Sequence, residues 1–87
     1  MDIANWRTKI DKLENTLIEL LNNRARYAVE IGKIKKEKGL PVFDASREQE
    51  ILSRVAEKAK KQGGPLSPES MKHIFQVIMI ETRQVEK

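Results

Sequence analysis

Two basic residues interrupt the apolar face of a long helical segment in the first half of the chain. Arg24 and Lys35 are eleven residues apart, which in a helix is three turns and a difference of only about 20° in direction. Both lie in line with apolar residues such as Leu20 and Ala28, on the face that should be buried. Because guanidinium and ammonium groups bind carboxylates, this spacing predicts a site for an anionic ligand.

Two further predicted helices also place polar residues on an apolar face. Arg47 and Glu48 directly precede the apolar face of the second helix, and the apolar face of the third continues through Thr82 to Glu86. An unpaired buried charge is costly, so we expect these groups to meet one another, a ligand or water. Basic residues exceed acids at these positions, which favours a carboxylate compound as the ligand.

Each of these polar residues also has a simpler structural interpretation. A single arginine or lysine on such a face can extend its head group to solvent. Arg47 and Glu48 could be solvated residues of a first helical turn, Thr82 could bond to its own helix, and Glu86 lies near the chain end, where helices fray. The simpler interpretation explains each residue but not their coincidence on three helices.

The first helix is too long for a compact domain of this size. Apolar residues at helical spacing predict it over about residues 3–38, with Gly39 as its C-cap. Such a helix spans about 54 Å, whereas a compact domain of 87 residues has a radius of gyration of about 12 Å. We therefore expect an obligate homodimer. Arg7 points about 100° away from Arg24 around the helix and could join the site of a second copy.

Capping signals predict the other two helices. Asp44 is the candidate N-cap of a helix over about residues 45–62, with Ser46 as a competitor. Ser67 and Pro68 begin a helix over about residues 68–86. The predicted fold is all-α: one domain over residues 1–87 with a long, a short and a medium helix.

The composition excludes several kinds of chemistry. The chain has no cysteine and a single histidine, so it cannot form a disulfide, a thiolate nucleophile or a multi-histidine metal site, and we expect no metal. The net charge of +4 is spread among acids and accompanied by only four aromatic residues, so we expect no nucleic-acid partner. No apolar run approaches the roughly 18 residues of a membrane span and no signal peptide is evident; we expect a cytoplasmic protein without membrane contact.

The sequence resembles the all-helical chorismate mutases over nearly its whole length. The resemblance lies in Arg7-x-x-Ile10-Asp11, Leu20-Leu21-Asn22-x-Arg24, Ala28-Val29-Glu30-Ile31-Gly32-Lys33-x-Lys35, Pro41-Val42-x-Asp44-x-x-Arg47-Glu48 and Ile74-Phe75-Gln76-x-Ile78. It implies an intertwined homodimeric helical bundle with two equivalent sites. The implied reaction is the cofactor-free conversion of chorismate to prephenate, a step towards phenylalanine and tyrosine.

The resemblance also assigns the site. The residues that would bind the dianionic substrate chorismate are Arg24, Lys35, Asp44, Arg47, Glu48, Thr82 and Glu86, with Arg7 contributed by the partner chain. The arginines would clamp the two carboxylates, Lys35 would face a carboxylate and the ether oxygen, and Glu48 would hold the hydroxyl. We expect Arg24, Lys35, Glu48 and Glu86 to be the catalytic residues, acting by selecting a compact conformer and stabilising charge on the departing oxygen.

Glu86 departs from the glutamine found in many members, whose amide donates a hydrogen bond to the ether oxygen. An ionised carboxylate cannot donate, so Glu86 must be protonated to take this role. The sequence therefore predicts activity that depends on pH. Thr82, where serine is commoner, keeps the hydroxyl.

Three other functions remain open at this point. An isochorismate pyruvate lyase shares the fold and takes a similar anion, and a fold alone does not decide between the two. A non-catalytic regulatory or dimerisation domain would not need Arg24. A DNA-binding helical domain would bind duplex in a strongly salt-dependent way.

Overall fold

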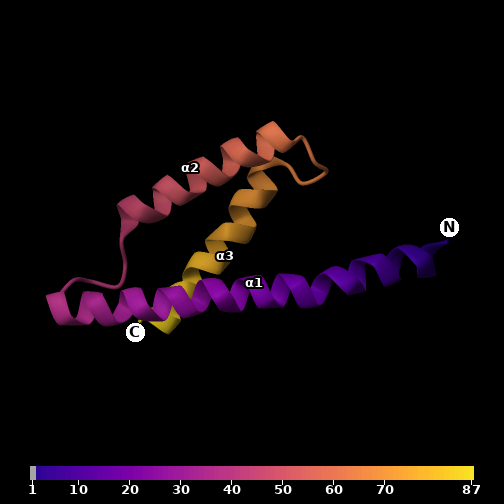
Figure 1. The fold of residues 1–87 in the computed structure, drawn as a ribbon. Helices are drawn as coiled ribbons and strands as arrows, with labels where there is room; N and C mark the ends of the chain where they lie inside the picture. The colour runs from indigo at the N-terminus through magenta and orange to yellow at the C-terminus, as the bar shows by residue number, and fades with distance from the viewer. Residues whose placement is uncertain (1) are drawn as a thin grey trace.

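The computed structural model describes residues 2–87, which form three α-helices (Figure 1). α1 spans Ile3–Lys38, α2 spans Ala45–Gln62 and α3 spans Pro68–Glu86. α3 runs from the far end of α2 back to the C-terminal half of α1, so the helices outline an open triangle. The chain extends over 55 × 25 × 15 Å, and its radius of gyration is 16.0 Å. The prediction of three helices is confirmed, and the shape is more extended than a compact domain of this length.

The helix ends follow the predicted caps. Asp44, and not the competing serine, caps α2, because its Oδ1 accepts a hydrogen bond from the backbone N–H of Arg47 at 3.0 Å. Ser67 caps α3 in the same way. Gly39 and Gly63 end α1 and α2 in the left-handed conformation, with φ of 66° and 63°, which glycine adopts without a steric penalty.

A small apolar core joins α2 to α3. Its buried members are Ile51, Leu52, Val55 and Met79, with Met71 and Phe75 packed against them. Within residues 2–87 no side chain is completely buried. A core of this size stabilises a single copy only weakly, because most of the apolar surface stays in water.

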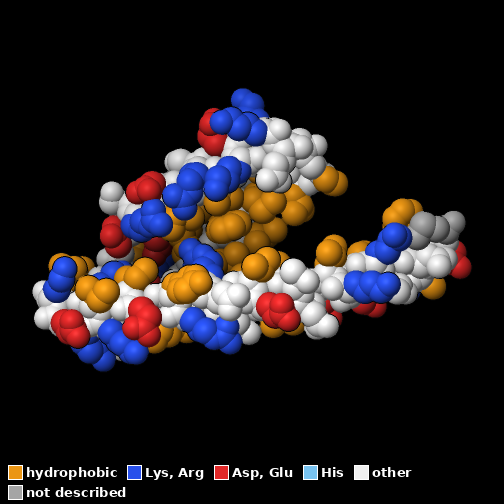
Figure 2. Space-filling view, in the orientation of Figure 1, with side chains coloured by type: hydrophobic (Ala, Val, Ile, Leu, Met, Phe, Trp, Pro, Cys, Tyr) orange, Lys and Arg blue, Asp and Glu red, His pale blue; other side chains and the backbone are white. Residues whose placement is uncertain are grey.

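The N-terminal half of α1 has no cover within the chain. Every residue from 2 to 23 is exposed, including Trp6 and Leu17 at 55 % and 59 %. In Figure 2 this half projects away from the rest of the molecule with apolar side chains on its surface. Across residues 2–87, no helix is both long enough and apolar enough to cross a bilayer. The stripe that the sequence predicts as a core face is therefore mostly exposed, because α3 covers only the C-terminal half of α1.

α3 reaches α1 at Gly32, which is buried. A Cβ atom at this position would lie 2.7 Å from the Cα of Glu86, closer than carbon atoms pack. The absence of a side chain at Gly32 therefore lets the end of α3 rest directly on α1. This close crossing places Glu86 beside the next turn of α1, where Lys35 lies.

Candidate active site

A cavity of about 340 Å³ lies where the three helices converge. In Figure 2 basic and apolar side chains line the hollow between α2 and the C-terminal half of α1. The polar residues around it are Arg24, Lys35, Asp44, Arg47, Glu48, Thr82 and Glu86, and the apolar ones are Ala28, Ile31, Val42, Ile51 and Met79. The volume is at the small end of the range for small-molecule sites. Seven of the eight residues that the sequence nominates thus surround one cavity.

The charges around this cavity balance within one chain. Three lining side chains are basic and three are acidic: Arg24, Lys35, Arg47, Asp44, Glu48 and Glu86. The sequence shows an excess of basic residues over Arg24, Lys35, Arg47, Glu48 and Glu86, and Asp44, which also lines the cavity, cancels that excess within one chain. A dianion would need positive charge from a further source, or a protonated acid, to find a favourable site here.

Arg24 is held in place by the hydroxyl of Thr82. Its Nη1 donates a hydrogen bond to Thr82 Oγ1 at 2.7 Å, and that hydroxyl donates in turn to the backbone oxygen of Ile78 at 2.6 Å. The proton of Thr82 is thus already used, so Thr82 orients Arg24 and has no proton free for a ligand. Arg24 keeps four N–H groups for other acceptors, enough for a bidentate carboxylate contact.

Lys35 and Glu86 form the most buried ion pair among the described residues. Lys35 Nζ lies 2.6 Å from Glu86 Oε1 and 2.8 Å from the backbone oxygen of Val42, and the two side chains are 17 % and 10 % exposed. An ammonium group has three N–H donors, so one remains for a ligand. Glu86 accepts in this arrangement, whereas the role that the family resemblance implies for it requires a donor.

Asp44 and Arg47 form the α2 side of the cavity mouth. Asp44 lies at the N-terminus of α2, where its negative charge also interacts favourably with the helix dipole. The Arg47 side chain is half exposed and is paired with Glu50 at 2.8 Å, a surface ion pair that a ligand can displace at little cost. Arg47 therefore carries a guanidinium whose present partner is a solvent-exposed carboxylate.

Glu48 is bound on both oxygens by Arg83, a residue that the sequence reasoning missed. Arg83 Nε and Nη2 donate to Glu48 Oε2 and Oε1 at 2.8 and 2.7 Å. These hydrogen bonds hold the pKa of Glu48 below its usual value, and they raise the pKa of Arg83. Arg83 follows Met79, the most buried core residue of α3, by four residues, so helical spacing places it beside the core face of α3 but does not reveal its pairing with Glu48.

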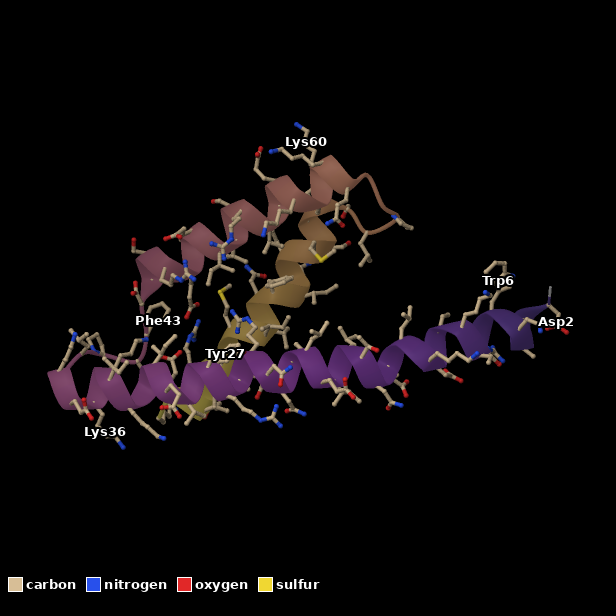
Figure 3. All side chains as sticks on the ribbon, in the orientation of Figure 1. Asp2, Trp6, Tyr27, Lys36, Phe43 and Lys60 are labelled. Atoms are coloured by element: carbon tan, nitrogen blue, oxygen red, sulfur yellow. The ribbon has the colours of Figure 1, made fainter. Side chains whose placement is uncertain are left out.

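Arg7 is the one predicted site residue that does not line the cavity. It lies 17 residues before Arg24, about 26 Å away along the helix axis. Figure 3 shows its neighbour Trp6 near the end of α1 opposite Lys36. Within one chain, therefore, Arg7 and the cavity are separate.

The fold is all-helical, and charged residues of its three helices line one cavity of small-molecule size. Residues 6–87 match the sequence model of a known family, chorismate mutase type II, and the chain belongs to that family. A solved structure of chorismate mutase (form II) from Thermus thermophilus is 30 % identical and superposes with a TM-score of 0.89, covering 97 % of this chain and 92 % of that one.

The curated relatives include a protein named only as a chorismate mutase and others with bifunctional names. A chorismate mutase from Methanocaldococcus jannaschii is 27 % identical over 98 % of this chain and 84 % of its own length. A bifunctional chorismate mutase/prephenate dehydratase from Aquifex aeolicus is 32 % identical over 99 % of this chain, and a protein of the same name from Neisseria gonorrhoeae is 35 % identical over 93 %. The chain spans about a quarter of the length of these bifunctional relatives, 24 % and 21 %.

Proposed function

We propose that this chain catalyses the rearrangement of chorismate to prephenate, on the way to phenylalanine and tyrosine. One observation carries the proposal: Arg24, Lys35 and Arg47, from two different helices, line one cavity of small-molecule size in a chain of the chorismate mutase type II family. Relatives such as the Methanocaldococcus jannaschii protein are named for this activity.

The chemistry requires only groups that bind and orient. In this Claisen rearrangement one C–O bond breaks while one C–C bond forms in the same molecule, and nothing is transferred to the protein. Catalysis then consists of holding the compact conformer and stabilising negative charge on the departing ether oxygen. Arg24 offers four N–H groups to a carboxylate, and Lys35 directs its third N–H at the ligand, so both act without giving up the hydrogen bonds that position them.

Glu86 contributes to the ether oxygen when it carries a proton. In the structure Glu86 Oε1 accepts a hydrogen bond from Lys35 Nζ at 2.6 Å. An ionised carboxylate only accepts hydrogen bonds, so the donor role at the ether oxygen requires the neutral form of Glu86.

A second copy of the chain completes the site. The exposed apolar stripe on the N-terminal half of α1 needs a partner, and the cavity needs positive charge beyond that of one chain. Antiparallel packing of two α1 helices about a twofold axis near Leu17 would bring Arg7 of each copy beside the cavity of the other. The intertwined homodimer would thus both cover the apolar stripe and bring positive charge to the cavity.

The proposal is tested by adding chorismate to the purified chain and following its loss. Arg24→Ala should lower kcat/KM by about a hundredfold or more, because a carboxylate loses a charged bidentate partner. Arg26→Ala is the matched control, since Arg26 is an exposed arginine on the opposite face of α1. Absence of rearrangement above background at any pH between about 5 and 8, or release of pyruvate from isochorismate with chorismate left intact, would contradict the proposal.

A further inference from the structure

Glu48 separates two hollows of the molecule. It lines the 340 Å³ cavity between α1 and α2, and it also lines a second hollow between α2 and α3 that Arg83 and Phe43 share. Arg83 itself does not line the first cavity. The guanidinium of Arg83 therefore binds Glu48 on the side away from the proposed substrate.

The geometry of the Arg83–Glu48 pair is more specific than that of a surface ion pair. Two parallel hydrogen bonds, at 2.8 and 2.7 Å, join both oxygens of Glu48 to Arg83, and the Arg83 guanidinium lies 4.6 Å from the ring centre of Phe43. Figure 3 labels Phe43 in the segment that joins α1 to α2. The aromatic ring and the paired hydrogen bonds together fix the plane of the guanidinium, and with it the plane of the carboxylate.

We propose that Arg83 is a positioning residue for the rearrangement, which keeps the carboxylate of Glu48 turned towards the hydroxyl of the substrate. The inference rests on the proposed function. Each carboxylate oxygen has two acceptor sites, so one on each oxygen stays available beside Arg83, and Glu48 lines the cavity.

Glu48 needs such a partner because a bound dianion would make the charge around it more negative. The charged groups that face it are Arg83 from α3, Lys35 from α1 and Asp44 from the start of α2. Asp44 raises the pKa of Glu48, whereas Arg83 and Lys35 lower it, Arg83 most strongly. A bound dianion adds two negative charges on the cavity side and engages Lys35. Arg83 is then the cation that remains free to keep Glu48 ionised and in place.

The test compares variants of Arg83 in a chorismate assay across about pH 4 to 8. Arg83→Met should lower kcat/KM by about tenfold and move the acid limb of the pH profile to higher pH, because Glu48 then protonates more easily. Arg83→Lys should restore the acid limb but only part of kcat/KM, since lysine keeps the charge and cannot make two parallel hydrogen bonds. Arg26→Met, on the far face of α1, is the control and should leave both quantities unchanged.

A double-mutant cycle with Glu48→Gln separates a role through Glu48 from a general structural role. In the Glu48→Gln background, Arg83→Met should have less than about a twofold further effect on kcat/KM. Fully additive losses, or an Arg83→Met variant with the acid limb and kcat/KM of the unmodified chain, would overturn the positioning role and leave the proposed function intact. An unmodified chain that does not rearrange chorismate would overturn both.

Discussion

The backbone of Glu86 rests directly on Gly32, with no room for a side chain between them: a Cβ on Gly32 would lie 2.7 Å from the Cα of Glu86 and 2.9 Å from its carbonyl carbon. The obstacle is backbone, so it cannot be relieved by a change of rotamer. Since Glu86 reaches Lys35 from this position, the close approach at Gly32 contributes to the geometry of the ion pair as well as to the packing of α3 on α1.

Gly32→Ala should therefore destabilise the protein and impair the site. Alanine gains about 1 kcal/mol over glycine in a helix interior, but overpacking costs about 1–3 kcal/mol, so we expect a net loss of free energy of unfolding. Displacement of Glu86 should also lower kcat by at least about tenfold. Urea unfolding and a chorismate assay measure the two effects.

Gly64→Ala provides the matched control for that substitution. A Cβ at Gly64 meets nothing within 4 Å, so the change should alter stability by less than about 0.5 kcal/mol. Equal behaviour of the two alanine variants would show that the crossing at Gly32 is not tight.

Replacing Glu86 by glutamine should widen the pH range of activity. The glutamine amide is the same size and can donate to the ether oxygen without first acquiring a proton. We expect the kcat of Glu86→Gln to depend less on pH than that of the unmodified chain, because the amide donates at every pH whereas a carboxylate donates only when it is protonated. Identical pH–rate profiles would mean that Glu86 does not act at the ether oxygen.

Two inactive variants should restore activity when they are mixed. In the proposed homodimer, Arg7→Ala and Arg24→Ala would each damage every site, but a mixed dimer would have one site with both arginines intact. After complete exchange at equal amounts, about a quarter of all sites should be restored. Measurement of activity before and after exchange checks this outcome. Arg7→Ala with unchanged activity, or a folded monomer in sedimentation, would exclude the shared site.

The stability of the fold should depend on pH through Glu48. Its pKa is held below the ordinary 4.5, chiefly by Arg83, so its ionised form favours the folded state. That contribution is complete above the unfolded pKa and disappears as the pH falls through the folded one. The difference in free energy of unfolding between the unmodified chain and Glu48→Gln should thus shrink below about pH 4.5. Urea titrations at fixed protein concentration measure it, and a difference that grows in acid would contradict the assignment.

The sequence could predict those features that depend on local patterns. Glycine, proline and cap residues mark the end of the first helix, both ends of the second and the start of the third, and a helical period of 3.6 is enough to place Arg24 and Lys35 on one face. The same period shows that Arg7 faces elsewhere. These features need no knowledge of how the helices pack.

Features that depend on packing between helices could not be predicted in this way. The pairing of Glu48 with Arg83 joins residues 35 apart, and the crossing at Gly32 depends on where the end of α3 meets α1. The balance of charge in the cavity depends on Asp44 facing inward while it also caps α2. Each of these relationships arises from the angle between two helices, which no single helical pattern encodes.

The fixed hydrogen-bonding groups of the site also distinguish a ligand from its mirror image. Arg24 is oriented through Thr82, Lys35 has a single N–H left, and Glu48 is held from behind by Arg83. These three anchors come from two helices, are chemically different, and surround one cavity. A mirror-image ligand could satisfy any two of them but not all three. In a racemic mixture, conversion should therefore stop when half of the material has been consumed.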